Sequence, residues 1–269
     1  MAAKRQIGEA MSKTKESATV ISQCCLQPGI YDMWIATTLA GEAKPGQFIC
    51  VYPKNASTLL PRPISICEVS EKRDALRIVY RVAGRGTAEF SAYEEKETIE
   101  VMGPLGNGFP IEAVTSPEQT VFLMGGGIGI PPLVQLAKEL NCKKKIIVGY
   151  RDANLFLKED LEKYGDVILA TEDGCVGTKG NVMDAIRENA LSASMIYACG
   201  PMPMLRAIKG YAADADIPAF ISLEERMACG VGACLGCVCR TKEVDHHSHV
   251  HNARICTDGP VFEAKEVEI

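Results

Sequence analysis

The sequence predicts an antiparallel β-barrel, then a parallel α/β sheet, and finally a short cysteine-rich segment. The first part alternates short β-branched runs with turn residues, which is typical of a small barrel. The second part alternates apolar strand-like runs with helix-like stretches, which is typical of βαβ units. The last part is rich in Gly and Cys and has little hydrophobic periodicity. The predicted boundaries are a flexible tail at 1–17, the barrel at 18–112, the sheet domain at 113–222 and the C-terminal segment at 223–269.

The composition indicates an ordinary globular protein: 269 residues, 47% hydrophobic and 23% charged, with a formal net charge of -5. The longest Lys/Arg run is 143–145, so we expect no nucleic-acid partner. The longest uncharged run, 119–137, contains four glycines and two prolines, which argues against a membrane helix. The first residues have no apolar signal region, so we expect a cytoplasmic protein. In a reducing compartment, the 12 cysteines indicate metal or redox chemistry.

In the barrel section, strands are predicted at 31–38, 47–52 and 76–82, and the glycine-rich stretch 103–108 is expected to connect the two domains. The same section contains Arg62-Pro63-Ile64-Ser65. An arginine fork can pair with a flavin pyrophosphate, and a serine hydroxyl can reach the edge of the flavin ring. Taken alone, this string also fits a strand with a surface arginine.

In the sheet domain, buried strands are predicted at 121–124, 145–150, 167–171 and 195–199, and helices at 131–140, 154–164, 182–190 and 203–212. A glycine run follows the first strand and opens the first helix, which is the context a dinucleotide-binding loop requires. A second candidate element follows the strand at 195–199, at a sheet edge where such folds bind ligands. The candidate dinucleotide residues are Gly125, Gly126, Gly127, Gly129, Cys199, Gly200 and Pro201. Asp152 stands near the position of a ribose-binding acid, which favours NAD over NADP.

The C-terminal segment carries Cys229, Cys234 and Cys237 in the spacing C-x4-C-x2-C, and Cys256 follows after 18 intervening residues. This spacing matches the plant-type ferredoxin arrangement for a 2Fe-2S cluster. The glycines at 230, 232 and 236 support it, because a loop that aims thiolates and N–H groups at one small anion needs positive φ. The alternative is a four-cysteine zinc knuckle, but zinc usually prefers paired C-x2-C units and only one is present.

Two further features accompany these cysteines. Cys239 is a possible substitute ligand, which we interpret as a packed residue. All four histidines, His246, His247, His249 and His251, precede Cys256. Imidazole ligates zinc and Rieske clusters, but four cysteine ligands are already present, so we favour a solvated loop.

Together the motifs resemble one family, the electron-transfer subunit of type B dihydroorotate dehydrogenase, within the ferredoxin reductase superfamily. The resemblance covers about residue 18 to the end. Its motifs occur in this order: 62–66, 79–81, 84–87, 103–109, the glycine run at 125, 199–204 and 224–230. The histidine-bearing insert and Cys239 depart from the family pattern.

The resemblance implies an FAD-binding barrel, an NAD-binding sheet domain and a C-terminal 2Fe-2S segment. It implies that the cluster ligands are Cys229, Cys234, Cys237 and Cys256. It implies FAD contacts at Arg62, Pro63, Ile64, Ser65, Val79, Tyr80, Arg81, Gly86 and Thr87.

The resemblance also implies a partner. Dihydroorotate would reduce FMN in a catalytic subunit, and electrons would pass through the cluster and FAD of this chain to NAD, in pyrimidine biosynthesis. A heterotetramer of two copies of each chain is expected, and no residue of this chain need act on dihydroorotate.

Two alternatives remain open. One is the flavin and iron-sulfur subunit of a ferredoxin-dependent NADPH oxidoreductase or sulfide dehydrogenase, whose different flavin loop argues against it. The other is a non-catalytic interaction module stabilised by zinc, which would be colourless.

Overall fold

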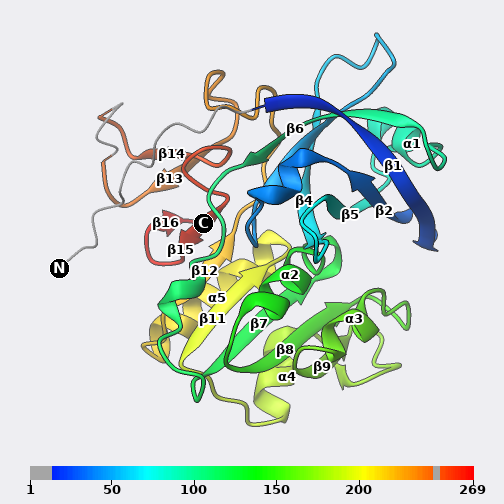
Figure 1. Cartoon of the computed structure of the whole chain (residues 1–269). Coiled ribbons are helices and arrows are strands. Elements are labelled where there is room, and N and C mark those ends of the chain that lie inside the picture. The colour runs from blue at the N-terminus through cyan, green and yellow to red at the C-terminus, as the bar shows by residue number, and fades with distance from the viewer. Residues whose placement is uncertain (1–13, 245–248) are drawn as a thin grey trace.

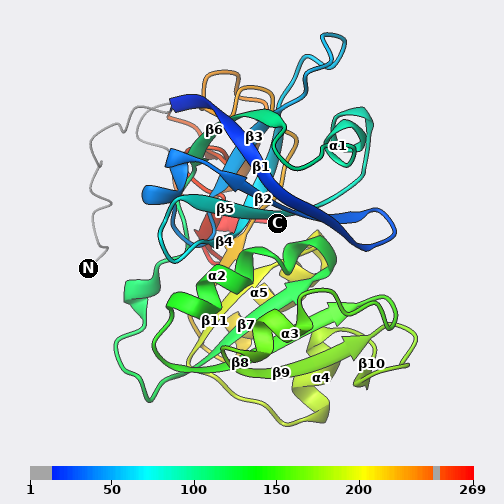
Figure 2. The same cartoon turned by 45° about the vertical axis from the view of Figure 1, so that its right-hand side comes forward.

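The computed structural model describes residues 14–244 and 249–269, and it contains a closed barrel, a seven-stranded sheet and a three-stranded sheet. Figures 1 and 2 show the barrel above the larger sheet. The fold class predicted from the sequence is confirmed. No helix within the described ranges is long and apolar enough to cross a membrane.

The barrel consists of antiparallel strands in the order β1-β2-β5-β4-β3-β6. Its interior is filled by apolar side chains, among them Met33, Ile35, Ile78 and Phe90. The elements are β1 (Thr14–Gln27), β2 (Ile30–Ala36), a 3-10 helix η1 (Thr38–Gly41), β3 (Phe48–Tyr52), β4 (Arg62–Val69), β5 (Ala75–Arg81), α1 (Arg85–Phe90) and β6 (Thr98–Leu105).

Two sequence predictions were wrong at the edges of the barrel. The predicted tail at 1–17 overlaps the first strand, because β1 begins at Thr14 and pairs with β6 from there. Residues 1–13 lie outside the described part of the chain. The predicted connection at 103–108 begins inside β6, which pairs Gly103 with Thr14 and ends at Leu105. Both errors have one cause: pairing between strands far apart in the sequence leaves no local signal.

The larger sheet has the strand order β10-β9-β8-β7-β11-β12-β15 and is parallel except for β15. Chain order runs outward from β7 to β10 and then resumes on the other side of β7 with β11. The elements are η2 (Ile111–Ala113), β7 (Thr120–Gly126), η3 (Gly127–Gly129), α2 (Pro132–Glu139), β8 (Lys143–Tyr150), α3 (Lys158–Glu162), β9 (Asp166–Thr171), β10 (Thr178–Lys179), α4 (Val182–Glu188), β11 (Met195–Cys199), α5 (Met202–Asp214) and β12 (Ala219–Ser222).

Helix α3 is much shorter than the predicted helix at 154–164. Leu157 precedes it with a φ of 62°, a left-handed conformation in which an α-helix does not continue. The residues before it are held in other ways: Asn154 donates to the Asp152 carboxylate from its backbone and its amide, and the carbonyl of Phe156 accepts from the Tyr150 hydroxyl. Tertiary contacts therefore replace the first turns of the predicted helix.

The C-terminal segment contributes to both sheets. Strands β13 (Val238–Thr241), β14 (Asn252–Arg254) and β16 (Val267–Glu268) form the small sheet. Strand β15 (Val261–Glu263) pairs antiparallel with β12 at the edge of the large sheet. The segment is therefore anchored in the sheet domain by main-chain hydrogen bonds.

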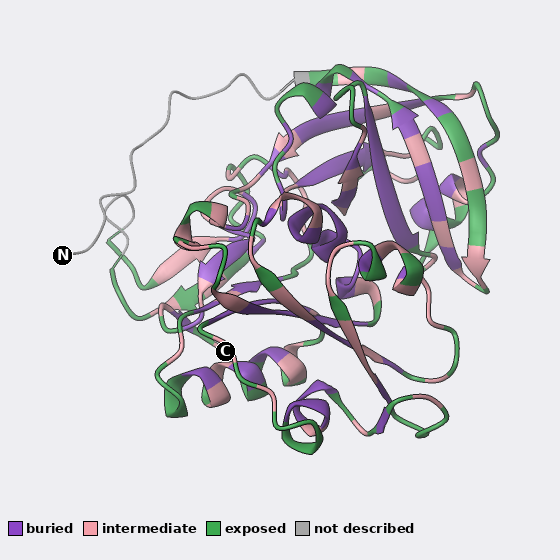
Figure 3. Cartoon of the chain, turned by 60° about the horizontal axis from the view of Figure 1, so that its bottom comes forward, coloured by how far each residue is buried: buried purple, intermediate pink, exposed green. Residues whose placement is uncertain are grey.

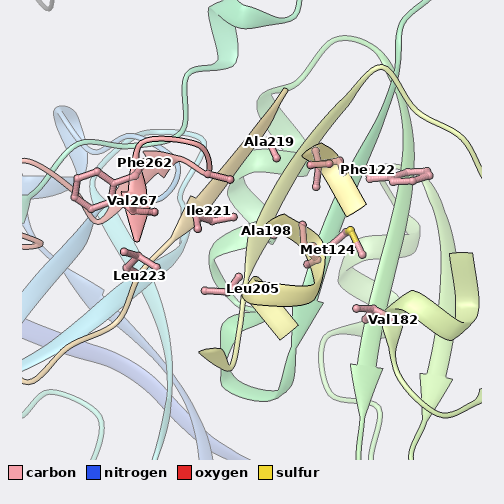
Figure 4. Packing of buried hydrophobic residues seen from close by; sticks show 14 of the residues in the cluster. Phe122, Met124, Val182, Ala198, Leu205, Ala219, Ile221, Leu223, Phe262 and Val267 are labelled. Atoms are coloured by element: carbon pink, nitrogen blue, oxygen red, sulfur yellow. The ribbon is translucent and has the colours of Figure 1, made fainter. Parts of the chain in front are cut away.

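One buried apolar cluster, which we call the shared core, contains residues from the barrel, the sheet domain and the C-terminal segment. Its barrel members include Cys50 and Leu105, and its C-terminal members include Cys256 and Phe262. Figure 4 shows Phe262 and Val267 beside Ile221 and Leu223. Figure 3 shows buried residues on many strands and on the inner faces of the helices, whereas most of β1 is not buried. The three parts therefore fold around common apolar contacts.

We predict that Phe262→Ala lowers the free energy of unfolding by about 3–5 kcal/mol, because it removes a buried ring from the shared core. Denaturant titration followed by circular dichroism measures this change. The control Lys265→Ala, at a side chain 73% exposed, is expected to stay within about 0.5 kcal/mol of the parent. A loss below about 1 kcal/mol for Phe262→Ala would mean that the Phe262 ring contributes little to holding the C-terminal segment in place.

Candidate functional site

The two candidate dinucleotide elements lie side by side at the carboxyl ends of neighbouring strands. β7 and β11 pair in parallel, with Gly125 opposite Cys199. The chain order of the sheet reverses between these two strands. Open α/β sheets bind ligands at such a switch point, because the loops that leave the two strands diverge and open a crevice.

Close packing explains why glycine stands at these positions. Gly125 and Gly126 end β7, and Gly127 and Gly129 form η3. A Cβ on Gly129 would lie 2.4 Å from the carbonyl oxygen of Cys199, so no larger residue fits between the two loops. The glycine loop after β7 and the loop after β11 are therefore in direct contact.

The second loop is also closely packed. Gly200 follows β11, and a Cβ there would lie 3.1 Å from the backbone nitrogen of Gly126. Pro201 caps the start of α5. The Cys199 side chain is fully buried, and burial raises the pKa of its thiol well above the ordinary value. Burial therefore favours the neutral form of the Cys199 thiol.

The candidate flavin residues lie on three adjoining elements of the barrel. Arg62, Pro63, Ile64 and Ser65 begin β4 and are half-buried. Val79, Tyr80 and Arg81 end β5, which pairs with β4. Gly86 and Thr87 lie in the first turn of α1. All nine predicted residues are thus on β4, β5 and α1.

Arg62 and the start of α1 are in direct contact. A Cβ on Gly86 would lie 2.8 Å from Nε of Arg62, so glycine leaves room for the guanidinium. Arg62 donates to the carbonyl of Leu60 at 2.6 Å. The Thr87 hydroxyl accepts from the backbone N–H groups of Ala83 and Gly84 and fixes the turn before the helix. The Arg62 guanidinium and the N-terminus of α1 therefore lie next to each other.

Two predicted flavin residues point away from the surface. The Tyr80 side chain is 1% exposed, and its hydroxyl donates to Oε1 of Gln23 at 2.7 Å inside the barrel. Val79 is buried in an apolar cluster together with Ile130, next to the glycine loop. These two residues can contact a ligand through their backbone, whereas Arg81 presents an exposed side chain.

Glu224 is a site candidate that the sequence analysis did not single out. It follows β12 and interacts electrostatically with Arg81 of the barrel and with Cys199 of the sheet domain. Glu224 is an exposed residue, but its carboxyl group is largely surrounded by protein atoms. This desolvation raises the pKa of Glu224, against the opposing charge of Arg81. The sequence alone gives little reason to single out Glu224, because it belongs to a run of charged residues, Glu224-Glu225-Arg226.

The cysteine loop lies against the barrel. Gly230 is buried, and a Cβ on it would lie 2.7 Å from Sγ of Cys50. Gly230 and Gly232 have φ values of 68° and 79°, which only glycine adopts at little cost. The expectation for the third glycine was wrong: Leu235, not Gly236, has a positive φ in this loop.

Backbone N–H groups point at three of the four candidate ligand sulfurs. Val231 and Cys234 donate to Sγ of Cys229, both at 3.4 Å. Gly232 donates to Sγ of Cys256 at 3.1 Å, and Gly236 donates to Sγ of Cys234 at 3.4 Å. Such donors stabilise thiolates, which are the form that binds metal.

The four thiols form two interacting pairs. Cys229 interacts with Cys234, Cys256 interacts with Cys237, and the charge of Cys229 also acts on Cys256. Within the described ranges, no group of three or more His, Cys, Asp or Glu side chains is already arranged as the ligand set of one metal ion. Two pairs of cysteines suit a binuclear iron-sulfur cluster, in which each iron takes two protein ligands. The residues present therefore fit the predicted cluster.

The ionisation of the cysteines differs strongly across the loop. Burial alone would raise the pKa of Cys229, but backbone hydrogen bonds outweigh it and lower the value to about 6. Burial and the neighbouring Cys237 raise the pKa of Cys256 to about 12. Cys239 lies on β13 and packs against the shared core, and burial raises its pKa to about 11.

His249 and His251 are exposed in the structure. His246 and His247 lie outside the described residues. The interpretation of the insert as a solvated loop therefore stays a prediction.

Comparison with known proteins gives the following relatives. Residues 224–268 match the family model for the iron-sulfur cluster binding domain of dihydroorotate dehydrogenase B. The chain is 41% identical to the electron transfer subunit of dihydroorotate dehydrogenase B (NAD(+)) from Geobacillus sp. (strain WCH70), over 94% of this chain and 98% of that protein. It is also 41% identical to the corresponding subunit from Bacillus velezensis, over 95% of this chain and 99% of that protein.

Two solved structures share the fold. An NADH-dependent reduced ferredoxin-NADP oxidoreductase matches with a TM-score of 0.82 and 27% identity, over 96% of this chain and 91% of that one. A ferredoxin NADP+ reductase from Neisseria gonorrhoeae, with bound FAD and NADP, matches with a TM-score of 0.63 and 15% identity, over 79% of this chain and 94% of that one. The second likeness concerns the fold alone.

We predict that Gly129→Ala lowers the free energy of unfolding by about 1–3 kcal/mol, since its methyl group would collide with the Cys199 carbonyl. The matched control is Gly210→Ala in the interior of α5, where a Cβ meets no atom within 4 Å. This control is expected to gain roughly 0.5–1 kcal/mol. Denaturant titration measures both, and equal stability of the two variants would refute the tight contact between the loops.

Proposed function

The chain belongs to the family of electron transfer subunits of NAD-dependent dihydroorotate dehydrogenase B, and from this premise we propose that it passes electrons through a 2Fe-2S cluster and FAD to NAD. It is an oxidoreductase subunit of pyrimidine biosynthesis that works with a catalytic partner. The observation that carries the proposal is that backbone N–H groups donate to the sulfurs of Cys229, Cys234 and Cys256 in the segment that matches the iron-sulfur domain.

Cys229, Cys234, Cys237 and Cys256 are the proposed ligands of the 2Fe-2S cluster. The N–H groups directed at the sulfurs of Cys229, Cys234 and Cys256 stabilise negative charge on these three ligands. Cys237 and Cys256 are buried, whereas Cys234 is exposed and Cys229 is half-buried. One pair of ligands therefore faces the protein interior and the other lies near the surface, as transfer to a partner chain requires.

For FAD, we propose that Arg62 and the α1 start at Gly86 and Thr87 bind the pyrophosphate. The guanidinium supplies charge-assisted hydrogen bonds, and Gly86 keeps the space beside it open. The remaining proposed contacts are Pro63, Ile64, Ser65, Val79, Tyr80 and Arg81. Because the Val79 and Tyr80 side chains are buried, their contribution is made by the backbone.

For NAD, we propose binding at the switch point between β7 and β11. The glycines at 125, 126, 127 and 129 let the pyrophosphate approach the backbone, and Cys199, Gly200 and Pro201 line the facing loop. The Asp152 carboxylate lies after β8 and accepts from Asn154, which orients it. We propose that it recognises the ribose of NAD.

When bound, FAD exchanges a hydride with nicotinamide and single electrons with an iron-sulfur cluster, so it links the two kinds of transfer. The chain's own residues bind and orient these groups, and none is proposed as a catalytic acid or base. We propose an FMN-containing catalytic subunit as the partner, in a heterotetramer with two copies of each chain. A cytoplasmic location fits this proposal, because the cysteines of the described residues form no disulfide bonds.

The alternative is a subunit of a ferredoxin-NADP oxidoreductase or sulfide dehydrogenase. The match to an NADH-dependent reduced ferredoxin-NADP oxidoreductase over nearly the whole chain favours it. The 41% identity to dihydroorotate dehydrogenase subunits, against 27% to that structure, makes it the second candidate.

Reconstitution tests the proposal directly. The isolated chain is expected to reduce an artificial dye with NADH but not to oxidise dihydroorotate, because it lacks the FMN site. Adding the FMN-containing subunit is expected to restore dihydroorotate oxidation coupled to NAD. If the mixture reduces ferredoxin or sulfur compounds but leaves dihydroorotate untouched, the second candidate replaces the first.

A ligand substitution tests the cluster assignment. Cys234→Ser is expected to abolish the visible absorption and electron paramagnetic resonance signals of the cluster while flavin stays bound, because Cys234 and the flavin residues lie on different parts of the chain. The matched control is Cys239→Ser two residues beyond Cys237, which is expected to keep the cluster. Loss of flavin with retention of the cluster in Cys234→Ser would contradict the assignment.

A further inference from the structure

An ion network lies between the barrel and the sheet domain, apart from all three candidate cofactor sites. Its centre is Arg77 on β5, and its carboxylates are Asp32 on β2, Glu68 on β4 and Asp160 on α3. Lys138 on α2 binds Glu68 from the other side. We call these five residues the interdomain ion network.

Arg77 uses its whole guanidinium in this network. Its Nε donates to both Asp32 oxygens at 3.0 and 3.1 Å, and its Nη2 donates to Asp32 at 2.7 Å. Nη1 donates to Glu68 at 3.2 Å, and Nη2 also reaches Asp160 at 3.2 Å. The side chains of Arg77 and Asp32 are only 10% and 9% exposed. This pairing is too well buried to be an ordinary surface contact.

Several of these bonds cross from one domain to the other. Arg77 belongs to the barrel and Asp160 to the sheet domain, and Lys138 of the sheet domain donates to Glu68 at 3.1 Å and to the Val69 carbonyl at 3.3 Å. Next to them, the backbone N–H of Val69 donates to the buried side chain of Gln135 on α2 at 2.8 Å. The network therefore ties β4 and β5 to α2 and α3.

The elements that meet here are the ones that carry the candidate sites. Arg77 lies two residues before 79–81 on the same strand, and α2 begins directly after the glycine loop. Strand β4 begins with Arg62 and ends at Val69, which is held by Gln135. Any rotation of the barrel against the sheet would move the proposed flavin site relative to the proposed NAD site and would break these bonds.

Energetics favour an orienting role over a stabilising one. Buried ion pairs often add little net stability compared with apolar residues of similar volume, because the charges lose hydration. They do require one geometry, since any displacement leaves a charge unpaired. Hydrogen bonds from Arg77 and Lys163 lower the pKa of Asp160 although burial opposes this, so Asp160 is charged at neutral pH.

We propose that the interdomain ion network is a positioning device, in which Arg77, Asp160, Glu68 and Lys138 fix the barrel against the sheet domain so that flavin and nicotinamide meet in the reactive arrangement. Arg77 is a positioning residue in this scheme and touches no reacting atom. The proposal rests on the proposed function for the hydride transfer, but the domain contact itself does not depend on it.

The sharpest variant is the double substitution Asp160→Asn and Lys138→Met. It removes the two ionic links that cross the interface and leaves Arg77 paired with Asp32 and Glu68 inside the barrel. Arg77→Met is less informative, because it would leave the buried Asp32 carboxylate without its partner and threaten folding. The matched control is Lys158→Gln, which breaks an ion pair with Glu162 on the same helix α3 and does not touch the network.

The first measurement is hydrogen exchange of the full chain. The Val69 amide reports on the interface, because its acceptor, Gln135, belongs to the other domain. In the double variant we expect its exchange to become at least about 10-fold faster, as for a contact opened locally. Amides of the β4–β5 ladder away from the interface and the Lys158→Gln control are expected to be unchanged.

The second measurement is flavin reduction by NADH in rapid mixing. The double variant is expected to lose at least about 10-fold in the limiting rate of flavin reduction, because small misplacements of reacting groups cost large factors in rate. The NADH concentration at half-saturation is expected to change less than about 3-fold, since the NAD site on the sheet remains intact.

Unchanged Val69 exchange in the double variant would overturn the proposal. Faster exchange together with an unchanged limiting rate would also overturn it, by showing that the network stabilises the interface without setting the transfer geometry. If the parent protein itself shows no flavin reduction by NADH, the proposed function fails, and the exchange result alone then decides whether the network holds the two domains together.

Discussion

The shared core is the contact on which the arrangement of the whole chain depends. Barrel residues such as Cys50 and Leu105, sheet residues such as Ile221, and C-terminal residues such as Cys256 lose their exposure in the same apolar cluster. Since none of the three parts buries this surface alone, each is placed by the other two. The cysteine loop is short of apolar residues of its own, and it acquires a defined path by packing Gly230 against the barrel.

Much of the fold was readable from local sequence. Four of the six parallel strands, β7, β8, β9 and β11, were predicted within two residues of their ends, because they are short unbroken apolar runs between polar loops. The short strands β10 and β12 were not predicted. The candidate dinucleotide loops were also readable, since glycine is required where Gly129 contacts Cys199. The spacing of Cys229, Cys234 and Cys237 predicted a common loop, and the structure directs N–H groups at sulfurs in it.

What the sequence did not show depends on contacts between distant segments. Arg77, Asp32 and Asp160 look like solvated charges when read in their own segments, and only the packed domains bury them together. Glu224 gains its unusual environment from Arg81 and Cys199, which come from two different domains. Leu157 adopts a left-handed conformation that no local pattern predicts. In each case the physical cause is tertiary, so a reading by periodicity and propensity misses it.

Strand β15 has a consequence for the solubility of this architecture. An unpaired strand at the rim of a sheet offers free N–H and C=O groups to any other extended chain, and so invites self-association. By lying antiparallel along β12, β15 occupies these groups with a stretch of the same polypeptide. Strand β15 then forms the edge itself, but it is only three residues long, Val261–Glu263, and a short edge strand offers few groups to another chain. The C-terminal segment thus shortens the open edge of the large sheet, and a relative that lost this segment would expose β12 instead.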